Sequence, residues 1–240
     1  MRTDRLAPPV RYPGRHPWPD PVRPNHAVNI GTVIYGGAVG TTATLPARGN
    51  VLIIGRVGKT NLARVLAAEF ADRPNSAVIA AGIRGGMHFR DVNGVDLVDL
   101  PPESHAEMLA ALDSLKETLR QRIDHDDRGH LAVILDGVDL RLQQAAEAVA
   151  DMALLARTVD AQLILTAPPL MATTSRWRHL TMTVDHLVSI DPRDLALAYR
   201  PVWHTQPIPS GPLPADPSLA VVATGKTVQP VQIYHHPIPD

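Results

Sequence analysis

Residues 51–66 carry the sequence VLIIGRVGKTNLARVL, which changes character twice along its length. The first four residues are apolar, which is typical of a short strand buried on both faces. A turn with two glycines follows and ends in Gly-Lys-Thr at 58–60. Beyond the turn, large apolar side chains recur at helical spacing as far as Phe70. The sequence therefore predicts a strand over 51–54, a glycine turn, and an amphipathic helix over 59–71.

Strand, glycine turn, Lys-Thr and helix are the layout of a phosphate-binding P-loop, whose usual spacing is Gly-x-x-x-x-Gly-Lys-Thr. In such a loop the lysine reaches the β- and γ-phosphates and the threonine hydroxyl binds Mg²⁺, the positions that Lys59 and Thr60 occupy here. Only two residues separate Gly55 from Gly58, however, so the loop is two residues short. Two interpretations stay open: a phosphate site that depends on the helix N-terminus, and a strand–turn–helix corner with a surface lysine.

Length, composition and charge limit the classes of protein to which the chain can belong. The 240 residues suit one α/β domain with extensions, and the low aromatic content of 4% predicts a core of Val, Ile, Leu and Ala. With 23 basic and 24 acidic residues, bulk charge gives no indication of nucleic acid. The absence of cysteine excludes disulfides and Cys-ligated metals. No apolar run has the length of a membrane span and no signal peptide is visible, so we expect a cytoplasmic protein.

The remaining segments predict a mostly parallel sheet covered on both faces by helices. Further strands are predicted at 28–35, 38–45, 76–81, 95–100, 130–135, 162–166, 181–190, 220–224 and 228–234. Further helices are predicted at about 104–122, with Ser104 as N-cap, at about 142–159 and at 191–200. The first two strands, joined by two glycines at 36–37, predict an N-terminal β-hairpin, and the last two predict C-terminal antiparallel strands.

Two segments are rich in proline. Residues 1–26 contain seven prolines and five arginines and predict an extended arm. Residues 201–217 contain six prolines and predict a linker. We expect 27–240 to form the domain, with this linker inside it.

A carboxylate follows the apolar strand at 130–135. Asp136 lies where the Mg²⁺-binding acid of a P-loop enzyme is found, because the carboxyl ends of parallel strands meet in one crevice. Efficient ATPases usually place a glutamate next, as the base that activates water, and here the next residue is Gly137. Asp139 is acidic but does not have to face the phosphate. Asp136 as a turn-capping residue remains the alternative.

Several segments together resemble one family. Residues 51–66 are similar to the Walker A region, and 131–140 to the Walker B region, of the FtsK/SpoIIIE/HerA family of RecA-like, DNA-pumping ATPases. Residues 81–86 resemble the turn after its second strand, without the Asp and Pro of that turn. Residues 154–169 resemble its Leu-Ala-Arg to Thr-Gln-Arg-Pro segment. In the last of these, Ala167 or Pro168 stands in place of the γ-phosphate-sensing glutamine.

The resemblance, which extends from Val28 to Tyr234, implies a RecA-like P-loop core and a set of site residues. It assigns nucleotide contacts to Gly55, Gly58, Lys59, Thr60 and Asn61. It assigns Mg²⁺, held together with the nucleotide, to Thr60 and Asp136. Arg193 is a candidate for an arginine that acts on a neighbouring subunit's nucleotide.

Loop length, base, sensor and second-strand turn all depart from the family pattern. Four changes in one crevice favour a non-hydrolysing protein, a DNA- or protein-binding scaffold of a phage or mobile element that binds ATP and Mg²⁺ weakly or not at all. The alternative hypothesis is an active, ATP-driven DNA translocase subunit. For either, we expect assembly with copies of itself, as in a hexameric ring, or with an active paralogue, and double-stranded DNA as a candidate partner.

Overall fold

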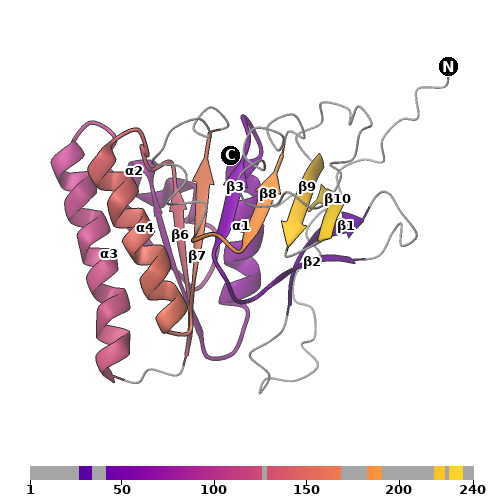
Figure 1. The fold of residues 1–240 in the computed structure, drawn as a ribbon, viewed down its shortest axis with the longest axis horizontal. Helices are drawn as coiled ribbons and strands as arrows, with labels where there is room; N and C mark the ends of the chain where they lie inside the picture. The colour runs from indigo at the N-terminus through magenta and orange to yellow at the C-terminus, as the bar shows by residue number, and fades with distance from the viewer. Residues whose placement is uncertain are drawn as a thin grey trace.

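The computed structural model describes residues 27–33, 42–125, 129–168, 183–190, 219–224 and 227–234, and its central feature is one ten-stranded sheet (Figure 1). The strands are β1 (Ala27–Val33), β2 (Thr42–Pro46), β3 (Val51–Ile54), β4 (Ser76–Gly82), β5 (Val95–Asp99), β6 (His130–Asp136), β7 (Ala161–Ala167), β8 (His186–Ser189), β9 (Leu219–Thr224) and β10 (Thr227–Ile233). Their order across the sheet is β2-β1-β10-β9-β8-β3-β7-β6-β4-β5.

The two halves of the sheet differ in strand direction. Neighbours from β5 to β8 are parallel, and neighbours from β8 to β2 are antiparallel. The mostly parallel core with an N-terminal hairpin and C-terminal antiparallel strands is therefore confirmed. The strand β7 separates β3, which leads into the glycine loop, from β6, which ends in Asp136.

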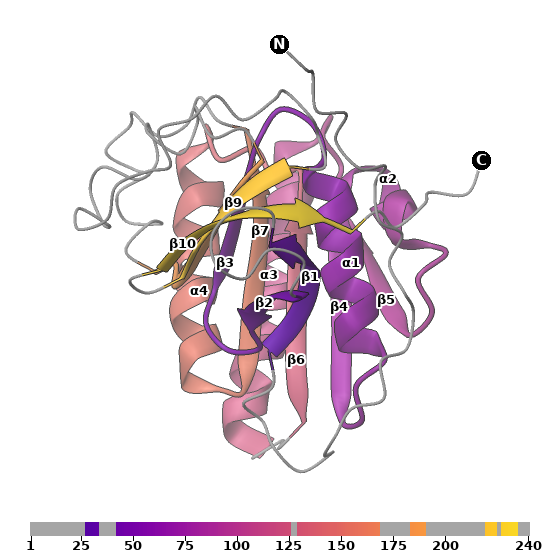
Figure 2. The ribbon, with the colours of Figure 1, turned by 90° about the vertical axis from the view of Figure 1, so that its right-hand side faces the viewer.

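Helices cover the two faces of the sheet unequally (Figure 2). The helices are α1 (Lys59–Ala71), the short α2 (Ile83–Gly86), α3 (His105–His125) and α4 (Gln143–Thr158), and a 3-10 turn spans Met87–Phe89. On one face α3 and α4 lie side by side and pack on the sheet through leucines, alanines and methionines. On the other face α1 packs on side chains from both halves of the sheet.

The helix α1 is more deeply buried than its amphipathic pattern predicts. Every residue from Leu62 to Phe70 is buried, including Arg64 and Glu69. The antiparallel half of the sheet contacts α1 as well, and the backbone N–H of Asn29 in β1 donates to the Glu69 carboxylate. Arg64 forms an ion pair with Asp91, its Nη2 at 2.5 Å from Oδ2. The polar side chains of α1 thus have partners, which is what burial of charged groups requires.

A buried asparagine organises the end of the sheet opposite the glycine loop. The Asn50 side-chain amide donates to the carbonyls of Ala153 and Thr183, both at 2.8 Å, and its oxygen accepts from Leu163 N at 3.1 Å. The backbone N–H groups of Asp185 and His186 donate to Asn50 O. Because 183–185 turn toward Asn50, β8 begins only at His186, and the strand predicted over 181–190 is shorter than expected.

Most predicted element boundaries agree with the structure. The helix predicted over 59–71 is confirmed as α1, and Ser104 Oγ accepts from Glu107 N at 3.3 Å, as an N-cap of α3 does. The glycine turn at 36–37, the helix at 191–200, the arm and the linker lie outside the described residues.

Candidate functional site

The glycine loop joins β3 to α1 at the carboxyl end of the parallel strands. Gly58 has φ +83° and ψ −13°, the left-handed conformation that glycine adopts without steric cost, and it precedes the first residue of α1. No side chain caps this helix end, and its first turn contains no acidic residue. The first N–H groups of a helix lack intrahelical partners and carry partial positive charge, so this end of α1 suits an anion.

Lys59 contacts its own loop. Its Nζ donates to the carbonyl of Gly55 at 2.7 Å and to that of Arg56 at 3.4 Å. Burial lowers the pKa of Lys59, and the charge of Asp136 partly opposes that shift. The ammonium group thus already has acceptors within the shortened loop, and a phosphate would have to compete with them.

Asp136 is held from two sides by hydroxyl groups. Thr60 Oγ1, from α1, donates to Asp136 Oδ2 at 2.9 Å. Thr166 Oγ1, from β7, donates to Asp136 Oδ1 at 2.5 Å. A carboxylate and a threonine hydroxyl are hard oxygen donors of the kind that Mg²⁺ uses together with nucleotide phosphates and water. The predicted pair Thr60 and Asp136 is therefore brought together, and its chemistry suits Mg²⁺.

The position after Asp136 cannot readily carry a larger side chain. Gly137 has φ +90°, in the left-handed region, and a Cβ built on it would lie 2.8 Å from Cδ1 of Ile83. Both the backbone and this neighbour thus disfavour a glutamate here. Asp139 faces elsewhere: its carboxylate accepts from Arg141 Nε at 2.8 Å and Nη2 at 2.7 Å. The hydrogen bond from Arg141 lowers the pKa of Asp139, which weakens that carboxylate as a base.

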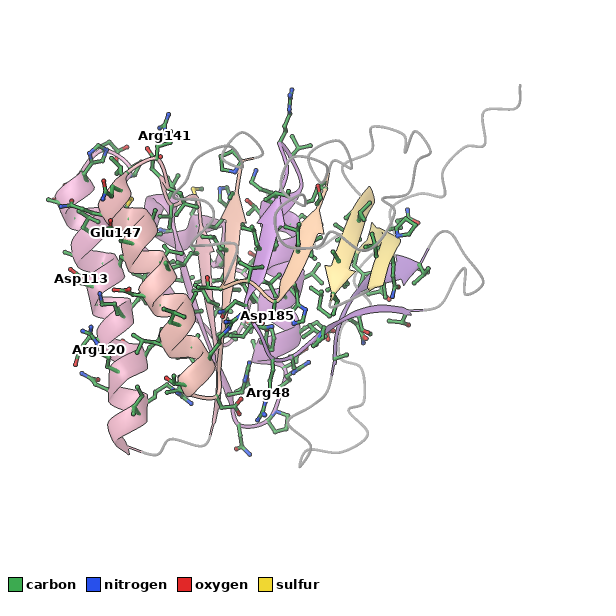
Figure 3. All side chains as sticks on the ribbon, viewed as in Figure 1. Arg48, Asp113, Arg120, Arg141, Glu147 and Asp185 are labelled. Carbon is green, nitrogen blue, oxygen red and sulfur yellow. The ribbon has the colours of Figure 1, made fainter. Side chains whose placement is uncertain are left out.

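Charged side chains form separate ion pairs at the two ends of the sheet. Figure 3 shows Arg141 at the end where α3 and α4 begin, far from Arg48 and Asp185. Asp185 accepts from Arg157 at the opposite end. Among the residues that the structure describes, no three His, Asp or Glu side chains lie close enough to hold a metal ion by themselves.

Three further predictions concern residues outside the Thr60–Asp136 pair. Asn61 Nδ2 donates to the carbonyl of Tyr234 at 2.8 Å and so connects α1 to the end of β10. The segment over 81–86 continues from β4 into α2, where Ile83 faces Gly137. Arg193 lies outside the described residues.

Sequence reasoning missed Thr166. It expected the sensor position at Ala167 or Pro168, but the side chain that reaches Asp136 belongs to the preceding residue. The signal was present, because β7 pairs in parallel with β6 and places Thr166 beside Asp136 on the same face. A polar residue at the carboxyl end of the strand next to β6 could therefore have been identified as a contact of Asp136.

No protein-family model matches the sequence, and no curated protein matches it. Solved structures do match in fold. The cytoplasmic domain of the type VII secretion ATPase EccC from Thermomonospora curvata has a TM-score of 0.69 at 16% identity, over 92% of this chain and 31% of that chain. ATPases 2 and 3 of the same EccC, in complex with a signal sequence peptide, give 0.65 at 13%, over 97% and 44%. The pCW3 conjugation coupling protein TcpA, as a monomer with ATPγS, gives 0.58 at 12%, over 94% and 71%.

These neighbours are P-loop ATPase domains of the FtsK/SpoIIIE type, so the predicted RecA-like fold is confirmed. At such identities the likeness is one of fold alone. This chain spans less than half the length of either EccC structure. None of the helices in the described part of the chain combines the length and the hydropathy that a membrane-spanning helix requires.

Proposed function

We propose that this chain, which has the fold of FtsK/SpoIIIE-type P-loop ATPase domains, is a nucleotide-binding domain that does not hydrolyse ATP at a motor's rate. Its role is then that of a scaffold in a cytoplasmic assembly of the secretion or conjugation type. The observation that carries the proposal is Gly137. Its left-handed backbone and the short distance that a Cβ would have to Ile83 disfavour the glutamate that would act as the base in hydrolysis.

Binding needs fewer groups than hydrolysis. The backbone N–H groups at the start of α1 and the Lys59 ammonium are the groups that would hold phosphates. Thr60 and Asp136 would hold Mg²⁺, and a bound Mg²⁺ ion would neutralise part of the phosphate charge. We expect modest affinity, because the loop is short and Lys59 must leave the Gly55 carbonyl to reach a phosphate.

Hydrolysis needs a water held and deprotonated next to the γ-phosphate. Asp136 is occupied on both oxygens by hydroxyl donors, and Asp139 is paired with Arg141. Neither carboxylate is therefore poised to take a proton from water. This supports binding without turnover.

The partners proposed for this chain are inferred from its structural neighbours. The neighbour EccC was solved with a signal sequence peptide bound to ATPases 2 and 3, and TcpA is a conjugation coupling protein. We propose that this domain associates with further RecA-like domains, its own copies or an active paralogue, and contributes to contact with a protein or double-stranded DNA cargo.

A second candidate function is an active DNA translocase subunit. The 2.9 Å bond between Thr60 and Asp136 is the observation that keeps it in place beside the first, because a metal site is common to binding and to turnover. The two functions differ in whether nucleotide is turned over, which can be measured directly.

The test combines a thermal shift with a hydrolysis assay, each with and without double-stranded DNA. A nucleotide at about five times its Kd stabilises by about 1 kcal/mol, which raises the Tm of a domain of this size by about 2–4 °C. We expect such a shift with Mg-ATP in the wild type and in the control Lys116→Ala, which lies on α3, and its loss in Lys59→Ala.

We expect no hydrolysis above the Lys59→Ala background. DNA-stimulated hydrolysis that Lys59→Ala abolishes would overturn the scaffold in favour of the translocase. The absence of any shift at millimolar Mg-ATP would overturn nucleotide binding.

A further inference from the structure

The hydroxyl of Thr166 contacts two other groups of the site, the Asp136 carboxylate and the backbone of Gly137. Thr166 is the last residue but one of β7, and it is 1% exposed. Its Oγ1 lies 2.5 Å from Asp136 Oδ1 and 3.3 Å from the backbone nitrogen of Gly137. None of the sequence motifs assigns this hydroxyl a role.

The chemistry of the three groups fixes the direction of both hydrogen bonds. A hydroxyl has one hydrogen to donate and two lone pairs, a backbone N–H can only donate, and an ionised carboxylate can only accept. Thr166 must therefore accept from Gly137 and donate its single hydrogen to Asp136. No hydrogen is left on Thr166 for a phosphate oxygen.

The same carboxylate is held on its other oxygen by Thr60 at 2.9 Å. The terminal torsion of an aspartate is broad, so the hydrogen bonds to its two oxygens set the orientation of the carboxylate. With Thr166 on Oδ1, Oδ2 is turned toward Thr60. The carboxylate and the Thr60 hydroxyl then present oxygens to the same point in the crevice.

We propose that Thr166 is a positioning residue that orients Asp136 toward the metal held with the nucleotide. It does this in place of the sensing residue expected at Ala167 or Pro168, and it contacts the carboxylate instead of the phosphate. The inference rests on the proposed nucleotide binding. Partners that orient a metal ligand typically contribute 10- to 100-fold to metal affinity.

The experiment measures the dependence of nucleotide binding on Mg²⁺. ADP is titrated into the full chain by calorimetry, once with Mg²⁺ and once with EDTA, and the ratio of the two Kd values is compared between variants. Thr166→Val removes the hydroxyl with little change in shape, Thr166→Ser keeps it, and Thr166→Ala serves if the valine variant does not fold. Thr158→Val, which removes an exposed hydroxyl at the end of α4, is the matched control.

We expect Thr166→Val to reduce the effect of Mg²⁺ on the Kd about 10- to 100-fold and to leave the Kd in EDTA unchanged. Thr166→Ser and Thr158→Val should keep the wild-type ratio. A general structural defect would weaken binding in EDTA as well, and Thr166→Ser would not rescue it. An unchanged ratio in Thr166→Val would overturn the inference and leave the proposed function intact.

Binding of Mn²⁺ alone, followed by electron paramagnetic resonance, gives a readout without nucleotide. If the wild type binds no ADP but binds Mn²⁺, and Thr166→Val weakens that binding, the proposed function fails and the positioning role stands. If the wild type binds neither ADP nor Mn²⁺, both fail.

Discussion

Replacing Gly137 by glutamate restores, in sequence, the base that an ATPase of this type carries, and we expect it to cost stability without a gain in activity. An L-residue in the left-handed region costs about 1–2 kcal/mol. The new Cβ would lie 2.8 Å from Cδ1 and 3.1 Å from Cγ1 of Ile83, and moving the end of this flexible side chain costs about 1 kcal/mol more. The expected loss is about 2–3 kcal/mol, or a fall in Tm of roughly 5–10 °C.

Urea denaturation and a coupled ATPase assay on the same samples check both parts. Gly137→Ala is the matched control, since it adds the Cβ and the backbone strain without the carboxylate, and we expect it to lose nearly as much stability as Gly137→Glu. A Gly137→Glu protein as stable as the wild type would refute the backbone argument. Lys59-dependent hydrolysis in that variant would refute the claim that the site is closed to a base.

Three further predictions concern the core. Asn50→Ala removes three buried hydrogen bonds, two to the carbonyls of Ala153 and Thr183 and one from Leu163 N, and should lower the free energy of unfolding by about 3 kcal/mol in urea denaturation, with Asn50→Asp retaining part of that stability. Asp91→Ala should destabilise by about 3 kcal/mol and more than Arg64→Met, because it removes the carboxylate that is paired with a fully buried guanidinium, and equal losses in thermal melts would contradict this. Burial lowers the pKa values of His130 and His186, so below pH 6.5 the unfolded chain binds protons that the folded chain does not; stability should fall as the pH drops from 7 to 5.5, and less so in His130→Gln.

Periodicity was sufficient to predict the framework of the fold. The helix over 59–71 and the strand ending in Asp136 could be predicted because apolar spacing and a glycine turn are local properties. The burial of α1 on nearly all sides could not, because it depends on contact with β1, which comes from a distant segment of the chain. Arg64 and Glu69 look like surface residues in the sequence and are buried in the fold.

The residues of the site could be predicted from the sequence, but their geometry could be predicted only in part. Lys59, Thr60 and Asp136 were identified from spacing, and the structure brings Thr60 and Asp136 into contact. The contact of Lys59 with its own loop could not be predicted from the sequence, because it arises from the backbone path of a short turn. The glycine at 137 permits a positive φ but does not by itself predict one. Thr166 would have been found by following strand register from Asp136 to the neighbouring strand.

The enclosure of α1 has an evolutionary consequence. Selection for a stable core acts on residues 62–70 whether or not nucleotide is present, because side chains from both halves of the sheet pack against them. The first glycine of the loop is under the same pressure, since a Cβ at Gly55 would lie 2.9 Å from that of Ile190. The outer part of the loop, where Val57 is 61% exposed, is free of this demand. A lineage that lost ATP turnover would therefore drift first in the outer part of the loop, while α1 and Gly55 stayed as they are for reasons of stability.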